Sequence, residues 1–288
     1  MFKHTKQLAF KVRVDKPNPV YAKMLQQAIG GVEGEIRVCL QYMFQGWGFR
    51  GPDRYRDMLL NTGTEEIGHI EMLATAVALN LEDAPAKIQE EIAGKDGAVA
   101  AVLGGEDPRH VISSGLSAMP VDANGNPFNG SWVVATGNLA ADMHANVTAE
   151  GGGRLLATRL YEMTDDPGMK EMLSFLIARD TMHQNQWMAV LEELKDMGMP
   201  VPSDFPQEQE NQEFSYEFLV HSDGEVPKDA RWTSGTSVDS KGKFGVREAE
   251  PYGDVPHLAP AEARPEMHST IEPAKAGILR KAKDAVTP

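Results

Sequence analysis

The chain has 288 residues, which is enough to bury a large core and is longer than most single domains. Its net charge of −14 argues against contact with a phosphate backbone, so we expect no nucleic-acid partner. The N-terminal MFKHTKQLAFKV lacks the apolar stretch of a signal peptide, and no run of about 18 apolar residues follows, so we expect no membrane association. Cys39 is the only cysteine, which excludes an internal disulfide and suits a reducing cytoplasm, where we expect the protein.

Helical spacing, with apolar residues recurring at three and four, runs through four segments. They are residues 19–48, 53–80, 137–164 and 167–197. The stretches FRGPD and TDDPG, with the Pro and Gly of tight turns, join the first segment to the second and the third to the fourth. The long stretch between the second and third segments indicates a crossover. We therefore predict an all-α four-helix bundle with one long crossover connection.

Proline divides the chain into two parts. Eight prolines lie in residues 1–199 and ten in residues 200–288. The second part is expected to be an extended segment with turns, although Trp232, Phe244 and Tyr252 indicate that parts of it pack on something. We therefore expect a bundle domain at 1–199 and a proline-rich C-terminal arm at 200–288 that lies on neighbouring subunits of a homo-oligomer.

Four of the eight histidines have an acidic residue three positions before them: His69, His110, His183 and His257. On a helix this spacing puts both side chains on one face. His110 follows Gly and Pro residues and His257 follows Pro256, so neither is expected on a helix, and both are set aside. His69 and His183 remain as candidates for a metal site.

The two tight turns place further acids level with these motifs. Antiparallel helices joined by a short turn bring residues equally distant from it to the same height, because both rise ~1.5 Å per residue. The position level with Glu66 is Glu35, and the position level with His183 is Glu150. Each hairpin thus has an acid on its first helix and an acid-x-x-His on its second, the second hairpin using Asp180.

The alternative interpretation is that these acids belong to ordinary solvated helix faces. The neighbours argue against it, because Glu35 stands among Val32, Ile36 and Val38, and His69 stands between apolar residues. Burying a carboxylate in such surroundings is costly unless a cation or hydrogen bonds compensate its charge. The pattern therefore favours a metal site.

Three stretches resemble the non-haem manganese catalases: GGVEGEIRVCLQYMFQGWGFRG, TEEIGHIEML and RLYEMTDDPGMKEMLSFLIARDTMHQNQW. The resemblance covers about residues 20–200, and the tail fits the family more loosely. It implies a ferritin-like bundle with a two-metal carboxylate site. It also implies disproportionation of hydrogen peroxide to water and dioxygen, and assembly into a homo-oligomer, a hexamer by analogy with the family.

Carried over by position, the resemblance implies five ligands for two manganese ions per subunit. Glu35 and His69 would bind one ion, Glu150 and His183 the other, and Glu66 would bridge them. Oxygen and nitrogen donors without a thiolate suit manganese or iron. Peroxide disproportionation consists of two two-electron steps, which suits a pair of redox metal ions.

The resemblance also implies roles for residues around the ligands. Tyr42 matches a tyrosine that hydrogen-bonds a ligand carboxylate. Asp180 matches a position that is not a ligand, from which it could hydrogen-bond His183 or a metal-bound solvent and relay a proton. Arg154 is the available substitute for a basic residue of some relatives; the alternative is a surface arginine paired with an acid.

Some relatives also bind calcium between subunits, and the resemblance allows such an ion at Asp57. Two departures weaken this match: Asn61 replaces a second acid, and HSDG at 221–224 fits the calcium loop only roughly. Glycines near the ligands, including Gly30, Gly68 and 151–153, suggest close helix approach or room for peroxide. The alternative is that 151–153 merely distort the third helix.

Two other functions remain open at the level of sequence. One is a di-iron oxidase or ferroxidase with the same ligands. The other is a non-catalytic metal-binding, iron-storage or coat protein with the same bundle. A storage cage does not need a proline-rich arm of nearly ninety residues, which weakens the storage interpretation. Fold does not decide between these functions.

Overall fold

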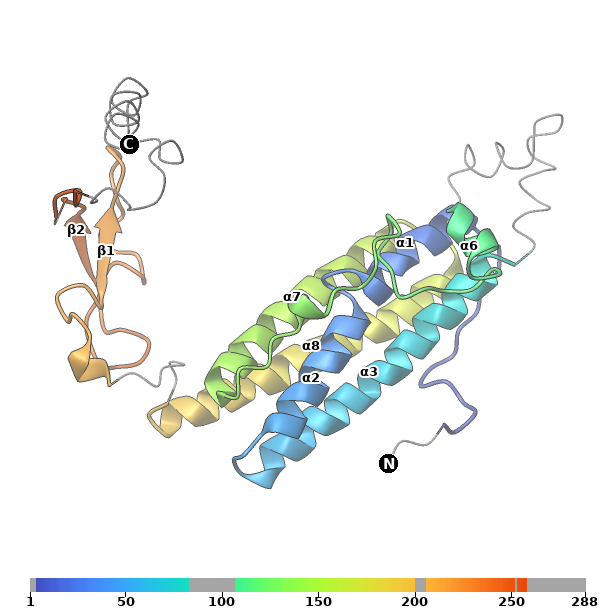
Figure 1. Ribbon diagram of the computed structural model, residues 1–288, viewed down its shortest axis with the longest axis horizontal. Helices are drawn as coiled ribbons and strands as arrows, with labels where there is room; N and C mark the ends of the chain where they lie inside the picture. Colours follow the sequence, from blue (N-terminus) through green and yellow to red (C-terminus); the bar gives the residue numbers. More distant parts are fainter. Residues whose placement is uncertain (1–3, 83–106, 200–205, 252, 258–288) are drawn as a thin grey trace, which may run out of the picture. The chain divides into compact units, whose positions relative to one another are not determined.

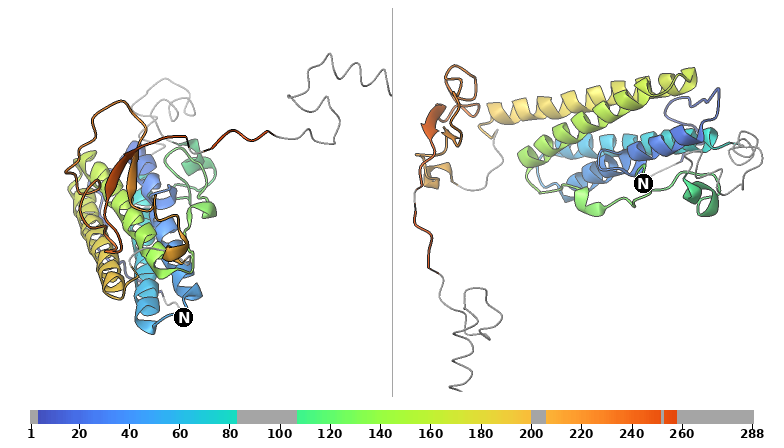
Figure 2. Two further views of the ribbon diagram at one scale, coloured as in Figure 1. Left: turned by 90° about the vertical axis from the view of Figure 1, so that its left-hand side faces the viewer. Right: turned by 90° about the horizontal axis from the view of Figure 1, so that it is seen from above.

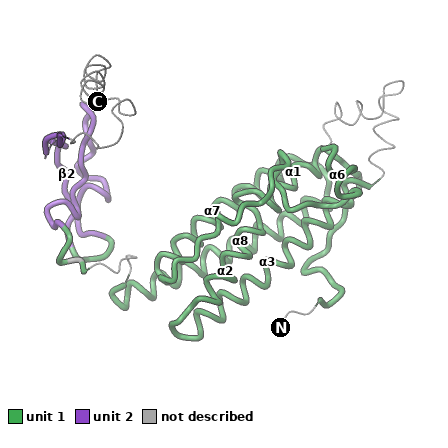
Figure 3. The backbone as a smooth tube through the Cα atoms, viewed as in Figure 1, with its two compact units in different colours: residues 1–210, 238–241 green, residues 211–237, 242–288 purple. Residues whose placement is uncertain are grey.

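The computed structural model describes residues 4–82, 107–199, 206–251 and 253–257. The chain forms two compact units, one of residues 1–210 with 238–241 and one of residues 211–237 with 242–288 (Figure 3). Residues 83–106 of the crossover expected between the second and third helices lie outside the described residues. The predicted division at residue 200 into bundle and arm stays a prediction.

Helices α2, α3, α7 and α8 run side by side in the first unit, as Figure 1 shows and the two views of Figure 2 confirm. α2 packs along α3, and α7 packs along α8. The helices are α1 (Pro19–Gly30), α2 (Glu35–Gly48), α3 (Asp53–Asn80), α6 (Pro108–Ile112), α7 (Leu139–Glu162) and α8 (Pro167–Asp196), with the 3₁₀ turn η1 (Gly130–Trp132). The predicted all-α, ferritin-like four-helix bundle is confirmed. None of these described helices is long and apolar enough to cross a membrane.

The expectation of one helix over 19–48 was wrong, because α1 ends at Gly30 and α2 begins at Glu35. A Cβ atom added at Gly30 would lie 2.5 Å from the backbone of Val121, so only glycine allows the chain at 121 to pass there. Gly31 and Gly34 cap the two helices in extended conformation. The break makes Glu35 the first residue of α2, where the helix dipole favours a negative charge.

Helix α7 continues without a break through Gly151, Gly152 and Gly153. A Cβ atom at Gly153 would lie 3.3 Å from the carbonyl oxygen of Glu33, and one at Gly151 would lie 3.2 Å from Nε2 of Gln184. The glycines therefore let α7 approach its neighbours closely.

Two apolar clusters fill the bundle, one towards each end of α3 and α8. On α3, Leu59 belongs to one cluster and Leu73 to the other. On α8, Trp187 belongs to the first of these and Leu176 to the second. The middle turns of both helices lie between the clusters, and there the buried side chains are polar. The fold thus places one polar site inside an apolar bundle.

The second unit contains two short strands, β1 (Glu217–Val220) and β2 (Gly245–Glu248), paired in parallel with Glu217 opposite Gly245. A 3₁₀ turn, η2 (Gln207–Gln209), precedes the unit. Trp232 packs on Phe218 with ring centroids 4.8 Å apart, and Arg231 lies over the ring of Phe244 at 5.4 Å. The third aromatic residue singled out in the sequence, at position 252, lies outside the described residues.

Candidate metal centre

Five side chains from four helices meet in the middle of the bundle, in two groups that share one member. The first group is Glu35, Glu66 and His69, and the second is Glu66, Glu150 and His183. Within each group, one potential ligand atom of every residue lies within 4.8 Å of the others. The equal heights expected from the two turns are thus found, and the shared residue is the one expected to bridge.

Glu66 lies between the two histidines. Its Oε2 is 2.6 Å from Nδ1 of His69, and its Oε1 is 2.8 Å from Nδ1 of His183. Nδ1 of His69 is also 3.8 Å from Glu35, and Nδ1 of His183 is 3.5 Å from Glu150. The same ring nitrogen of each histidine therefore faces the carboxylates, so the two groups have the same donor set.

The buried atoms of this cluster fit a pair of cations. Both side-chain oxygens of Glu66, and Nδ1 of His69 and of His183, have no hydrogen-bond partner within the described part of the chain. Glu66, His69 and His183 are each at most 1% exposed. Buried donors of this kind are costly unless something coordinates them. Carboxylates and imidazoles without a thiolate form a donor set that suits manganese or iron.

The pKa values of the residues in this cluster also indicate a site for positive charge. Burial alone would lower the pKa of His183, but the carboxylates of Glu150, Glu65 and Glu66 outweigh it and raise that pKa to about 12. Burial and then the charge of Glu66 raise the pKa of Glu35 to about 7. The buried carboxylates thus favour the protonated forms of these groups when no metal cation compensates their negative charge.

Tyr42 of α2 donates its hydroxyl hydrogen bond to Oε1 of Glu150, as the resemblance implies. The ring is fully buried and packs on Trp187, with centroids 4.9 Å apart. Burial and the nearby charges of Glu150 and Glu66 raise the pKa of Tyr42 well above its ordinary value. Tyr42 therefore remains protonated and fixes the orientation of Glu150.

Asp180 of α8 is buried but belongs to neither group. Burial, followed by the charges of Glu35, Glu150 and Glu66, raises the pKa of Asp180 to about 9. Both ring nitrogens of His183 face glutamates, and the two roles expected for Asp180, at His183 or at a metal-bound solvent, stay predictions.

Sequence reasoning missed two residues, Glu65 of α3 and Arg179 of α8. The guanidinium of Arg179 donates from Nε to Oε1 of Glu65 at 2.6 Å and from Nη2 to Oε2 at 3.2 Å. Glu65 stands next to Glu66 in the sequence and directly behind the two histidines. The adjacent acids of TEEIGH were the available signal, since adjacent helix positions point to different sides.

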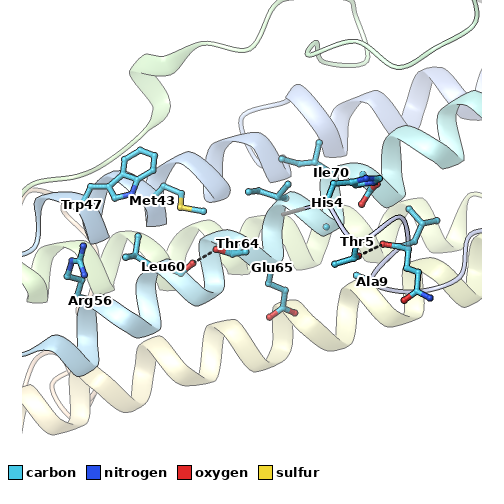
Figure 4. A pocket seen from close by; sticks show the side chains of 15 residues that line it. His4, Thr5, Ala9, Met43, Trp47, Arg56, Leu60, Thr64, Glu65 and Ile70 are labelled. Carbon is cyan, nitrogen blue, oxygen red and sulfur yellow. Dashed lines mark hydrogen bonds and ion pairs between the residues drawn. The ribbon is translucent and has the colours of Figure 1, made fainter. Parts of the chain in front are cut away.

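A cavity of about 1100 Å³ opens on the α2–α3 side of the bundle. The segment 4–9, Met43, Trp47 and Leu60 are among the residues that line it, and Glu65 forms part of its wall. Figure 4 shows the side chain of Glu65 leaving α3 and pointing towards α8. The outer side of the histidine pair thus lies near an open surface.

Two predicted residues lie at the surface. Arg154 is exposed and donates from Nε to the hydroxyl of Thr181 at 2.9 Å, so its partner among the described residues is a hydroxyl. Asp57 is exposed on α3, and the HSDG loop belongs to the second unit. A catalytic role for Arg154 and a calcium ion at Asp57 stay predictions.

The expectation that His110 is not on a helix was wrong. It lies in α6, a five-residue helix whose N-cap is Asp107. His110 is fully buried, and its Nε2 lies 3.4 Å from the side-chain oxygen of Gln26. It belongs to neither group of candidate ligands, so setting it aside as a metal ligand agrees with its place in the fold.

The fold and the site together define a ferritin-like bundle with a carboxylate-rich candidate site for two metal ions. The family model described as "Manganese containing catalase" matches residues 1–283. A manganese catalase of Bacillus subtilis (strain 168) is 49% identical over 94% of this chain and 98% of its own length. A manganese catalase of Lactiplantibacillus plantarum is 40% identical over 93% of this chain and 99% of its own length.

The crystal structure of KatB, a manganese catalase from Anabaena PCC7120, superimposes with a TM-score of 0.67. It is 23% identical and covers 86% of this chain and 99% of its own, so the likeness supports the fold alone. The family model and the relatives show more than the fold. The chain belongs to the family of manganese-containing catalases.

Proposed function

We propose that the chain disproportionates hydrogen peroxide to water and dioxygen at a site for two manganese ions per subunit. Glu35 and His69 hold one ion, Glu150 and His183 hold the other, and Glu66 bridges them. The observation that carries the assignment is that one buried carboxylate presents an oxygen to each of two matched groups. The manganese pair supplies, when bound, the two-electron redox capacity that each half of the disproportionation requires.

The protein's own contribution begins with orientation. Nδ1 of both histidines points at Glu66, so both rings present the same nitrogen to the site. Tyr42 fixes the orientation of Glu150 by its hydroxyl hydrogen bond. Apolar clusters above and below the site exclude bulk water along the bundle. A small substrate such as peroxide therefore meets ligands whose positions are set before it arrives.

Asp180 supplies a proton store beside the ligands. Its carboxyl group is buried, and burial together with the charges of Glu35, Glu150 and Glu66 raises its pKa. Two protons must leave the peroxide that becomes dioxygen, and two must reach the peroxide that becomes water. A buried acid next to the site can pass a proton in either direction during these steps.

The remaining parts of the proposal concern assembly. We propose a homo-oligomer, a hexamer by analogy with the family, in which the C-terminal arm lies on neighbouring subunits. Trp232 supports this, because it is 49% exposed even though it packs on Phe218. A calcium ion at Asp57 is a further proposal that rests on the resemblance alone.

A di-iron oxidase and a non-catalytic metal-binding or coat protein are not favoured, since the family model and the two relatives described above are manganese catalases. The deciding experiment measures the manganese and iron content of purified protein together with oxygen evolution from peroxide. We expect about two manganese per chain, rapid oxygen evolution and no haem absorption band. Iron-loaded protein that is as active as the manganese form would overturn the manganese assignment.

A further inference from the structure

Glu65 lies behind both histidine rings, on the side away from the proposed ligand-binding nitrogens. Its Oε1 is 3.5 Å from Nε2 of His69, and its Oε2 is 3.3 Å from Nε2 of His183. The two rings are stacked 5.8 Å apart with an interplanar angle of 25°. A single carboxylate therefore faces the outer nitrogen of each ring.

Arg179 completes a symmetric arrangement around this carboxylate. Its Nε contacts Oε1 at 2.6 Å and its Nη2 contacts Oε2 at 3.2 Å, so each oxygen faces one guanidinium nitrogen and one imidazole nitrogen. The guanidinium is always charged, and its planar fork matches a carboxylate in two-point contact. It holds Glu65 as an anion in one orientation, and an anionic carboxylate can only accept hydrogen bonds.

Neutral imidazole has one N–H and one lone pair, so a fixed acceptor at one nitrogen decides which nitrogen binds a metal. We propose that Glu65, clamped by Arg179, is a positioning residue that keeps both His69 and His183 protonated at Nε2 and leaves both Nδ1 lone pairs for manganese. The inference rests on the proposed metal site. The distances of 3.3 and 3.5 Å are long for hydrogen bonds, and such contacts shorten when a site is loaded.

The arrangement has a consequence that an ordinary ion pair would not have. Glu65 belongs to α3 and Arg179 to α8, so the pair also joins the two hairpins. Because one carboxylate orients both rings, its loss weakens both metal positions together, whereas loss of Glu35 or Glu150 weakens one. Partners of this kind typically change metal affinity or activity by about 10–100-fold.

Two variants separate the shared role from a structural one. Glu65→Ala removes both acceptors and should weaken both metal positions. Glu65→Gln keeps the size but offers a carbonyl to one ring and an NH₂ to the other, so it should weaken one position only. Glu193→Gln is the matched control, since the Arg54–Glu193 pair at 3.1 Å joins the same two helices and Glu193 contacts neither histidine.

The measurement is titration of the metal-free full chain with Mn²⁺, followed by ¹⁵N NMR of histidine-labelled protein loaded with diamagnetic Zn²⁺. We expect two tight positions and two Nε2–H signals in the wild type and in Glu193→Gln. We expect about a 10–100-fold loss of affinity at both positions in Glu65→Ala, and at one position, with one altered Nε2–H signal, in Glu65→Gln.

Two tight positions with both Nε2–H signals unchanged in Glu65→Gln would overturn the inference and leave only an interhelical ion pair. This variant also decides the question if Glu65→Ala does not fold. A wild-type chain that binds no metal would overturn the metal assignment itself, and the inference with it, so the two failures are distinguishable.

Discussion

The two hairpins of the bundle carry the same pattern and use it differently. In α2–α3 the acid of the acid-x-x-His motif is Glu66, which belongs to both groups of candidate ligands. In α7–α8 the corresponding acid is Asp180, which belongs to neither. Asp is one methylene shorter than Glu, so its carboxylate starts ~1.5 Å further from the bundle axis. One methylene therefore separates the proposed bridging ligand from a neighbouring acid.

The pKa values of the two acids diverge accordingly. Burial alone would raise the pKa of Glu66, but its two histidine contacts outweigh burial and lower it to about 2. Asp180 has no such contact, and burial together with the surrounding carboxylates raises its pKa to about 9. The pKa values of two equivalent helix positions thus shift in opposite directions, a separation typical of paired acid and base roles.

The largest expected effect comes from removing Glu66, the residue that belongs to both groups of candidate ligands. Glu66→Ala should lose both manganese ions and lower oxygen evolution by about 100-fold or more, since loss of a ligand exceeds the 10–100-fold cost of losing a ligand's partner. Elemental analysis and an oxygen electrode measure both quantities. Normal occupancy of both metals in Glu66→Ala would contradict the bridging role. Glu71→Gln, on an exposed part of α3, is the control.

The second prediction compares the unshared carboxylates. Glu35→Ala and Glu150→Ala should each reduce the content from two manganese to one per chain. Glu150→Ala should also lower the melting temperature more, because it leaves the buried Tyr42 hydroxyl unpaired at a cost of about 1–3 kcal/mol. Metal analysis and calorimetry test the two parts. Equal melting temperatures would show that Tyr42 finds another partner.

Part of the fold and of the candidate site could be predicted from the sequence. The helix periods and the two Pro/Gly turns predicted α3, α7 and α8 to within two residues at each end. The same turns predicted that Glu35 and Glu150 lie level with the acid-x-x-His motifs. Both inferences follow from the local geometry of one hairpin, which spacing along the chain determines.

Features that depend on contact between distant segments could not be found in this way. The break after Gly30 follows from the close approach of Val121, about ninety positions away. Likewise, Glu65 gains its importance from Arg179, which lies on the other hairpin. Spacing reports which residues share a helix face, but it does not report which face of a neighbouring helix they meet.

The third prediction tests whether Asp180 acts as an acid rather than as a ligand. Asp180→Asn keeps the shape of the side chain but cannot exchange a proton. It should retain both manganese ions, lose about 10–100-fold in turnover and show an altered pH–rate profile. Loss of one metal per chain in this variant would make Asp180 a ligand and the two hairpins equivalent.

The smallest expected effect concerns His110, an acid-x-x-His motif that lies outside both hairpins. Burial, with smaller effects of Lys23 and Arg109, lowers its pKa despite the nearby charge of Asp107. The folded state therefore holds His110 neutral, while the unfolded chain takes up a proton below its ordinary pKa of about 6.5. This is opposite to the raised pKa values of His69 and His183, although all three motifs read alike in the sequence.

The sign of the pH effect follows from this difference. Because the unfolded state binds more protons at acid pH, His110 reduces the free energy of unfolding as pH falls below about 6.5, by at most about 1.4 kcal/mol per pH unit. His110→Gln should leave metal content and turnover unchanged and should remove that slope. Urea denaturation of both proteins at about pH 7 and pH 5.5 measures it as a difference, so titration at the metal centre cancels. A variant with the wild-type slope would show that His110 accepts a proton in the folded protein, and loss of manganese would show that a third motif contributes to the site.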